Sequence, residues 1–256
     1  MTQTMTKSSL HLSTQQLHIL KIIYKFRFVT SNLVAKYRGV STSATNKAFI
    51  ILLQRGLIAR RFDKTYKLLG KSARYYLAPK ALKLLKTEYG LNEQVLHARY
   101  KDKSVGEPFV EHTLEIMTAC LNIRTAYPDT FTLFTKAELA KHDYFPQPLQ
   151  DLYLLRNKSS DNKTSEYFID IFSTGTLLFI IKKRIDQYID HFESGDWENN
   201  QYPVILLICP DNRIGHKLQK YVETTLDNKY IDETELTFLT GTDLNTLLNT
   251  TLKVTE

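Results

Sequence analysis

The sequence predicts an α/β protein, α+β overall, made of two parts that differ in charge and in hydrophobic pattern. Residues 1–103 hold 20 lysines and arginines against 4 acidic residues, whereas residues 104–256 hold 14 against 23. The first part shows helical spacing and then a short alternating stretch, and in the second part apolar strands alternate with helical patterns. We therefore expect two domains, and a polyanion is the expected partner of the basic one.

The bulk composition excludes several classes of protein. The 256 residues are 43% hydrophobic and 24% charged, which is ordinary for a globular chain. No apolar run reaches ~18 residues, and the first residues lack the apolar stretch of a secretory signal. The two cysteines, Cys120 and Cys209, do not have metal-ligand spacing, so a reducing, cytoplasmic location is expected. Glycine-rich phosphate loops and Gly-x-Ser-x-Gly elbows are absent from the sequence.

Three helices are expected in the basic part. Ser13 and Gln16 have the spacing of a capping box, and apolar residues follow at helical spacing up to Phe28. A second, short helix begins at residues 30–32 and stops at Gly39. Ser41 caps a third helix that runs to about residue 55, and its inner face is expected to consist of Ala44, Ala48, Ile51 and Leu52.

A β-hairpin follows these helices. Residues 57–62 and 73–77 have the pattern of paired strands, and residues 63–72 form a basic, flexible tip between them. Pro79 stands where the next helix takes its first residue. Three helices, a glycine-containing turn between the second and third, and a hairpin together predict a winged helix-turn-helix over residues 10–90.

The expected DNA contacts come from the third helix and from the wing. Hydroxyl, amide and ammonium groups near the start of that helix can reach base edges or phosphates in the major groove: Thr42, Ser43, Thr45, Asn46 and Lys47. Cations of the wing can contact the DNA backbone: Arg60, Arg61, Lys64, Lys67, Lys71 and Arg74. Two other interpretations stay open, namely solvated surface charges and a winged helix that docks proteins.

The acidic part predicts an α/β domain with a mixed sheet over residues 109–256, after a polar linker over residues 91–108. Helical spacing begins at Phe109 and stops at residues 127–129. Strands are expected at residues 131–134, 152–155, 167–172, 203–209 and 236–239. The expected later helices are residues 177–192, 217–226 and 243–252.

Three stretches together resemble the replication-relaxation family: STQQLHILKIIYKFRFVTSNLVAKYR, ARYYLAPKALKLL and WENNQYPVILLICPDNR, the last after an acidic strand and a basic helix. That family comprises plasmid- and mobile-element-associated proteins in which a winged helix is joined to a restriction-endonuclease-like domain. The similarity spans residues 13–215. The resemblance implies a restriction-endonuclease-like fold for the acidic domain, either degenerate or active.

An active domain of that kind would hold a divalent metal such as Mg²⁺ between acidic residues. The resemblance places Asp151 and Asp170 as metal ligands and catalytic residues, with Glu111 or Glu115 as a helical acid. The family's lysine two positions after the second acid is replaced by Phe172, and the lysines of the next helix, Lys182 and Lys183, are the candidates to replace it. The alternative is structural, with Asp170 paired to Arg184 or to a lysine.

The leading hypothesis is therefore a double-stranded DNA-binding protein without a cofactor, either a transcription regulator or a replication or mobilisation accessory of plasmid or mobile-element DNA. The acidic domain would serve a homodimer or dock a protein partner, and no membrane partner is expected. Apolar residues of the 177–192 helix can supply that surface or belong to the core: Ile185, Tyr188, Ile189 and Phe192. The alternative is a metal-dependent DNA-nicking enzyme that uses Asp151 and Asp170.

Overall fold

A computed structural model describes residues 12–157, 165–197 and 201–254 of the chain. Its first three helices are α1 (Thr14–Phe26), α2 (Ser31–Arg38) and α3 (Thr42–Gln54). Ser13, Thr30 and Ser41 each accept a hydrogen bond from a backbone amide of the first turn, and Gln16 completes the predicted capping box. The starts of all three helices are thus where the local sequence predicts them.

The wing is a two-stranded antiparallel hairpin. Strand β1 (Ile58–Arg61) pairs with β2 (Arg74–Leu77), and Ile58 lies opposite Leu77. The tip differs from the expected flexible loop, because it contains the short helix α4 (Lys64–Leu68). Asp63 caps α4 by accepting a hydrogen bond from the Tyr66 amide at 3.0 Å, and the buried Tyr66 ring fixes the turn.

The segment between the two parts is ordered and packed. Pro79 is the first residue of α5 (Pro79–Tyr89), as predicted, and α6 (Glu93–Arg99) lies within the segment expected to be a linker. Asn92 caps α6, and Val95 and Leu96 are buried in the main core. The chain then enters the long helix α7 (Glu107–Ala126). Sequence analysis did not predict this helix, because it buries only a few apolar residues, too few to show a period.

The acidic part contains a five-stranded mixed sheet with strand order β3-β4-β5-β6-β7. The strands are β3 (Phe131–Thr135), β4 (Leu152–Arg156), β5 (Glu166–Ile171), β6 (Val204–Ile208) and β7 (Phe238–Gly241). The first three pair antiparallel and the last three pair parallel. The remaining helices are α8 (Lys136–Leu139), α9 (Leu178–Ser194), α10 (Asn212–Lys229) and α11 (Leu244–Val254). This α+β arrangement with a mixed sheet is the one predicted.

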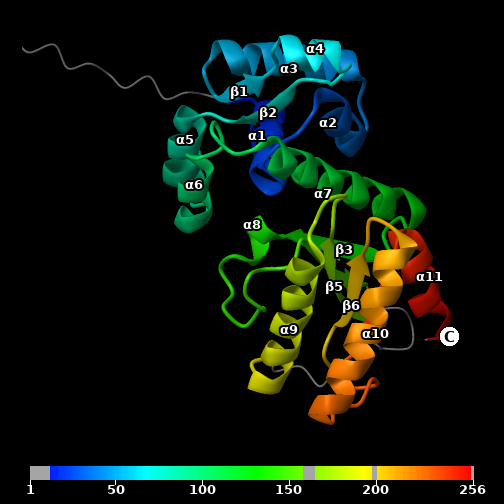
Figure 1. Cartoon of the computed structure of the whole chain (residues 1–256). Helices are drawn as coiled ribbons and strands as arrows, with labels where there is room; N and C mark the ends of the chain where they lie inside the picture. The colour runs from blue at the N-terminus through cyan, green and yellow to red at the C-terminus, as the bar shows by residue number, and fades with distance from the viewer. Residues whose placement is uncertain (1–11, 158–164, 198–200, 255–256) are drawn as a thin grey trace, which may run out of the picture.

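Helices cover both faces of the sheet (Figure 1). Side chains alternate along a strand, so Phe168 packs with α9 and α10 while Tyr167 and Ile169 pack on the opposite face with α7 and α11. Helix α7 runs between the sheet and the winged helix (Figure 1). One continuous apolar cluster extends from α1 and α3 through α7 to the sheet, so the two parts share a core.

The predicted docking surface on α9 is part of this interior. Ile185, Tyr188 and Ile189 are fully buried against the sheet, and Phe192 packs beside them. These four residues recur at three- and four-residue intervals, the spacing of the apolar face that a helix packs against a sheet. The exposed apolar residues of this region lie instead at the start of α9: Leu177, Phe179 and Ile180.

Across the described ranges, the helices are all too short or too polar to traverse a lipid bilayer.

Candidate nucleic-acid interface

The start of α3 presents a polar face to solvent. Ser41 Oγ accepts a hydrogen bond from the Ala44 amide at 3.2 Å, so the side chain that caps the helix also stands at its positive end. The predicted contact residues Thr42, Ser43, Asn46 and Lys47 are all exposed, as the sequence pattern requires for contact with a ligand. Together with the free amides of the first turn, they form a surface suited to phosphates and base edges.

The fifth predicted residue of this helix, Thr45, lies in the core. Its side chain is fully buried, and within the described residues its Oγ1 has no hydrogen-bond partner. The buried stripe of α3 is Thr45, Phe49 and Leu52, whereas the predicted inner residues Ala44 and Ile51 are exposed. The predicted inner face is shifted by one residue along α3. A shift of one residue corresponds to a rotation of about 100° around the helix axis. Alanine and threonine in the first turn gave no hydrophobic signal to fix that rotation.

Three of the predicted wing cations are used inside the protein. Arg61 donates hydrogen bonds to the carbonyl oxygens of Asp102, Lys103 and Val105 at 2.8–2.9 Å. Lys71 pairs with Glu107 at 3.2 Å and with Glu111 at 2.9 Å. Arg74, which is only 7% exposed, pairs with Glu111 at 3.0 Å. These contacts attach the wing to the start of α7.

Burial and charge act together at this attachment. Burial raises the pKa of Tyr66 to about 12, assisted by the hydrogen bond that its hydroxyl donates to Glu107 at 2.7 Å. Burial also disfavours the ionised form of Glu111, but Lys71 and Arg74 outweigh this effect and lower the pKa of Glu111. Glu111 is therefore charged at neutral pH, and it compensates the two wing cations that face it, Lys71 and Arg74.

The other predicted cations face solvent. Lys47, Arg60, Lys64 and Lys67 are exposed, and within the described parts of the chain none of them forms an ion pair with a carboxylate. Arg60 and Lys67 lie 5.7 and 5.9 Å from the ring centroid of Phe62. The Phe62 ring therefore brings two of the wing cations to one aromatic side chain.

The two acidic residues that the family resemblance singles out lie together at one end of the β4–β5 ladder. Asp170 Oδ2 accepts hydrogen bonds from Arg184 Nε at 2.5 Å and from the Tyr188 hydroxyl at 2.7 Å. Burial and the negative charge of Asp170 raise the pKa of Tyr188 well above its ordinary value. The pairing of Asp170 with Arg184, the structural alternative, is the one the structure contains.

Asp151 also has its own cations. Its Oδ1 lies 2.8 Å from Lys136 Nζ and 3.0 Å from His112 Nε2. Burial opposes ionisation of Asp151, but Lys136 and His112 outweigh it and hold its pKa well below the usual range. Burial likewise opposes protonation of His112, yet the hydrogen bond to Asp151 leaves the pKa of this histidine raised. Sequence analysis missed both partners, since they lie on other elements and belong to no motif.

This arrangement does not fit a metal centre. Cationic or N–H donors already engage all four carboxylate oxygens of Asp151 and Asp170. Glu111 faces the wing cations, and Lys182 Nζ lies over the ring of Tyr221 at 4.3 Å. Among the described residues, no group of three or more histidine, cysteine or acidic side chains is placed to hold a metal ion. Of the predicted nuclease residues, Asp151 and Asp170 thus lie side by side, whereas Glu111 and Lys182 are engaged elsewhere.

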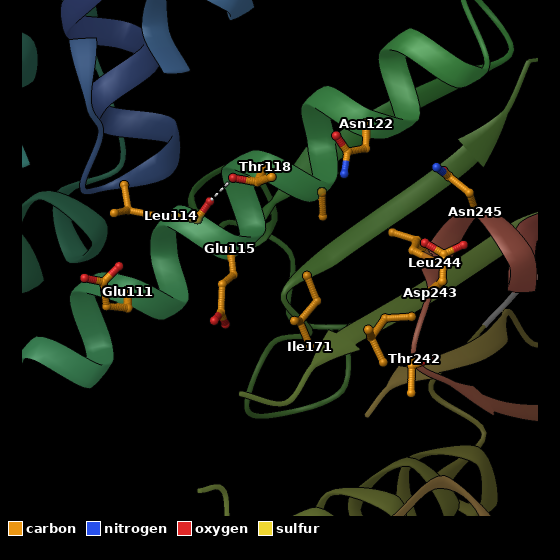
Figure 2. A pocket seen from close by; sticks show the side chains of 12 residues that line it. Glu111, Leu114, Glu115, Thr118, Asn122, Ile171, Thr242, Asp243, Leu244 and Asn245 are labelled. Carbon is orange, nitrogen blue, oxygen red and sulfur yellow. Dashed lines mark hydrogen bonds between the residues drawn. The ribbon is translucent and has the colours of Figure 1, made fainter. Parts of the chain in front are cut away.

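A cleft of about 390 Å³ lies between α7 and the carboxyl ends of β5 and β6. Figure 2 shows Glu115 and Asn122 extending from α7 toward this space, with Asp243 and Asn245 at the start of α11 across from them. Glu115 forms a hydrogen bond with the Ser173 hydroxyl, which lies just beyond β5. Glu115 is therefore tied to the loop after β5 and is separate from the pair of aspartates.

Comparisons with known proteins leave the family open. No family model matches the chain, and no curated protein is similar enough to count as a match. A structure of a cysteine-to-serine variant of Lactococcus lactis ZitR in complex with DNA is 22% identical, covers 47% of this chain and 78% of that chain, and has a TM-score of 0.28. A second structure of this variant is 21% identical with the same coverage and TM-score. Likeness at this level carries no argument, and membership of the replication-relaxation family stays a prediction.

Proposed function

We propose that this protein binds double-stranded DNA through the polar start of α3 and the solvent-facing cations of the wing. The observation that carries the proposal is the division of the basic residues into two sets. Arg61, Lys71 and Arg74 hold the hairpin against the linker segment and α7, whereas four cations face solvent without a carboxylate partner among the described residues: Lys47, Arg60, Lys64 and Lys67. The inner set positions the hairpin and its tip, which carry Arg60, Lys64 and Lys67.

Each outer group has a suitable role on a duplex. Asn46 and Lys47 lie in the first half of α3, where a helix placed in the major groove reaches base edges. Arg60, Lys64 and Lys67 lie on the hairpin and its tip, where they can neutralise phosphates beside the groove. Each neutralised phosphate releases condensed counterions, and this supplies much of the binding free energy at low salt.

The biological setting is a finer part of the proposal. The resemblance in sequence supports a regulator or a replication or mobilisation accessory of plasmid or mobile-element DNA. The acidic domain would then serve a homodimer or a protein partner, and the exposed Leu177, Phe179 and Ile180 support the presence of an apolar contact surface there. Because the donor set around Asp151 does not fit a metal, the proposal includes no cleavage step.

The test is a mobility shift of the full-length protein with a pool of random duplexes, followed by selection and sequencing of the bound molecules. We expect salt-sensitive binding, with log K falling by about 0.9 per unit of log salt for each phosphate neutralised. Absence of a shift at about 50 mM salt, where phosphate contacts are strongest, would remove the proposal. The full chain is needed because the winged helix shares its core with α7 and the sheet.

A further inference from the structure

A second, smaller pocket lies where the winged helix meets the acidic part. It has a volume of about 110 Å³ and lies between the end of α1, helices α6 and α7, and the start of α8. Five of its lining residues are basic: Lys25, Arg27, Arg99, His112 and Lys136. The one acidic residue among those that line it is Asp151. A pocket with this lining favours an anion over a neutral or cationic ligand.

Most of these cations have a carboxylate of their own. Lys25 pairs with Glu138 at 2.9 Å, Arg27 with Asp102 at 2.6 Å, and Lys136 with Asp151 at 2.8 Å. Their charges are therefore largely compensated by the protein, and they mainly shape the pocket. Arg99 is the exception.

Arg99 is a buried guanidinium without direct compensation. Its residue is 9% exposed, its Nη2 donates to the carbonyl oxygen of Tyr24 at 3.2 Å, and within the described residues its Nε has no hydrogen-bond partner. Burial, reinforced by the charge of Arg27, lowers the pKa of Arg99 to about 10, although Asp102 acts in the opposite direction. The single carboxylate of Asp102 thus faces three arginines, Arg27, Arg61 and Arg99, and Arg27 is the one whose side chain contacts it.

A buried charge is costly unless an opposite charge pairs with it. Arginine also presents a planar fork of N–H donors that matches two oxygens of a phosphate or a carboxylate. A water molecule takes up about 30 Å³ in the liquid. The pocket volume of about 110 Å³ is therefore larger than that of three water molecules and admits one tetrahedral oxyanion. We propose that this pocket binds a small oxyanion of the phosphate class, which pairs with Arg99 and is approached by Lys136 and His112 at the rim.

An oxyanion of this class can come from two sources: a free small anion, or a backbone phosphate of bound DNA. Lys136, whose side chain is 50% exposed, marks the open side of the pocket. We infer the free anion, because Arg99 ends α6 and lines the pocket with α7 and α8, whereas α3, whose exposed residues would meet a duplex, lies at the top of the view, away from α6 and α8 (Figure 1). A free anion would bind in the absence of DNA, and its loss would leave the DNA affinity unchanged.

The test is a titration of the full-length protein with inorganic phosphate, monitored by calorimetry and by thermal unfolding, against sodium chloride at equal ionic strength. We expect calorimetry to show saturable binding of phosphate, and Tm to rise steeply and then level off over the same range of phosphate concentration. Sulfate and phosphate also stabilise proteins in general by exclusion from their surface, but that effect does not saturate. Absence of a saturable heat, or a Tm that rises with phosphate without levelling off, would overturn the proposal.

Two variants locate the site. Arg99→Met keeps an apolar stem and removes the buried charge, so we expect phosphate affinity to fall by roughly tenfold to hundredfold. The same variant should raise Tm in phosphate-free buffer, since it removes an uncompensated charge. Lys136→Met, at the exposed rim, provides the second measurement if Arg99→Met does not fold, and it should weaken phosphate binding to a smaller extent.

The matched control is Lys101→Met, which removes an exposed positive charge two residues from Arg99 and outside the pocket lining. We expect it to leave phosphate binding unchanged. An equal loss in Lys101→Met would show that phosphate responds only to net charge, which would refute the site. If Arg99→Met instead weakens DNA binding and phosphate competes with DNA, the source is a backbone phosphate and the free-anion inference is wrong. Failure of the wild-type protein to bind any duplex would count against the proposed function alone.

Discussion

The carboxylate of Asp170 accepts a hydrogen bond from the backbone amide of Asp151 at 3.0 Å, and the carboxylate of Asp151 accepts one from the amide of Ile171 at 2.9 Å. Each aspartate thus binds the backbone of the neighbouring strand at the end of the β4–β5 ladder, where Leu152 lies opposite Ile169. The two acids close the ladder, and the cations around them compensate their charges. This role predicts effects on stability rather than on cleavage.

The first prediction concerns Asp170→Ala. The substitution leaves Arg184, which is 7% exposed, without its carboxylate, and it removes the acceptor of the Tyr188 hydroxyl. Loss of one partner of a buried ion pair costs about 3–5 kcal/mol. We expect the free energy of unfolding to fall by that amount in urea titrations of the full-length protein.

The control is the double variant Asp170→Ala/Arg184→Met, which removes both charges. Because an apolar replacement of a buried pair is often neutral, it should recover a large part of the stability lost in the single variant. A stable Asp170→Ala protein that has lost a magnesium-dependent nicking activity would contradict this interpretation and favour the nuclease alternative.

The second prediction concerns pH and His112. The pKa of His112 is raised in the folded protein above the ordinary 6.5, after burial is outweighed by the hydrogen bond to Asp151. A raised folded pKa means that the stabilisation is complete below the unfolded pKa and is lost as the pH rises through the folded one. We expect Tm to decline as the pH rises above about 6.5, and this decline should be absent in His112→Gln.

The exposed His216 on α10 offers a matched control, because within the described residues it forms no ion pair. His216→Gln should keep the decline of the wild-type protein. A profile for His112→Gln that is parallel to that of the wild type would show that another group titrates in this window.

The third prediction separates two lysines of the wing. Lys67 faces solvent, whereas Lys71 is paired with Glu107 and Glu111. Lys67→Ala should weaken binding to all duplexes and reduce the slope of log K against log salt by about 1. Lys71→Ala should leave that slope unchanged, since the lysine is already neutralised within the protein. The two slopes can be measured in parallel by fluorescence anisotropy.

Thermal unfolding of the same two variants completes this comparison. The Lys71 side chain is 31% exposed and its partner Glu107 37%, so solvent screens these ion pairs and only a small loss of Tm is expected. An equal reduction of slope in both variants would show that Lys71 leaves its glutamates on binding, and the division of the wing cations into two sets would be wrong.

Local signals in the sequence account for the elements that were predicted correctly. Ser13, Thr30 and Ser41 start their helices through hydrogen bonds to amides only a few residues away, so the sequence pattern contains all the needed information. The nearly continuous apolar run of β5 likewise reflects burial on both faces of the sheet, and the strand is found where it was expected.

The site depended on contacts that are distant in sequence. His112, Lys136 and Arg184 reach the two aspartates from three different helices, so spacing around Asp151 shows neither their presence nor their effect. The face that α3 turns toward the core likewise depends on the elements packed against it. Because the buried residue Thr45 is polar, the hydrophobic pattern did not mark that face. The wing cations could be predicted as a group, but not which of them would meet Glu107 and Glu111.

The fourth prediction contrasts two neighbours on α3. Thr45 is buried with a hydroxyl that has no partner among the described residues, whereas Asn46 is exposed. An unsatisfied buried hydroxyl costs about 1–3 kcal/mol, so Thr45→Val should stabilise the protein by about 1 kcal/mol and leave DNA binding unchanged. Asn46→Ala should leave stability unchanged and broaden the sequences recovered by selection, because its amide can no longer read a base edge.

If Thr45→Val loses sequence preference but keeps its stability, then Thr45 faces the DNA, and α3 is rotated relative to the orientation in which Thr45 is buried. The measurement is the enrichment of bound sequences, compared between the two variants and the wild-type protein at one salt concentration.

The last prediction is that residues 1–90 do not form a stable domain. Tyr24 and Lys25 at the end of α1 donate hydrogen bonds to the carbonyl oxygens of Ala137 and Leu133 at 3.5 and 3.1 Å, and the apolar cluster of the winged helix continues into α7. A fragment that ends at residue 90 would expose this surface and would lose the anchor of Arg61 and the acids that neutralise Lys71 and Arg74.

We therefore expect the fragment 1–90 to bind a hydrophobic dye and to unfold without a cooperative transition in circular dichroism. A fragment that ends at residue 126 restores Glu107, Glu111 and the apolar face of α7, so it should recover part of the cooperativity. A cooperative transition in the shorter fragment, with a Tm near that of the whole chain, would show that contacts within the three helices and the hairpin are sufficient. The shared core would then be a docking contact between two independent domains.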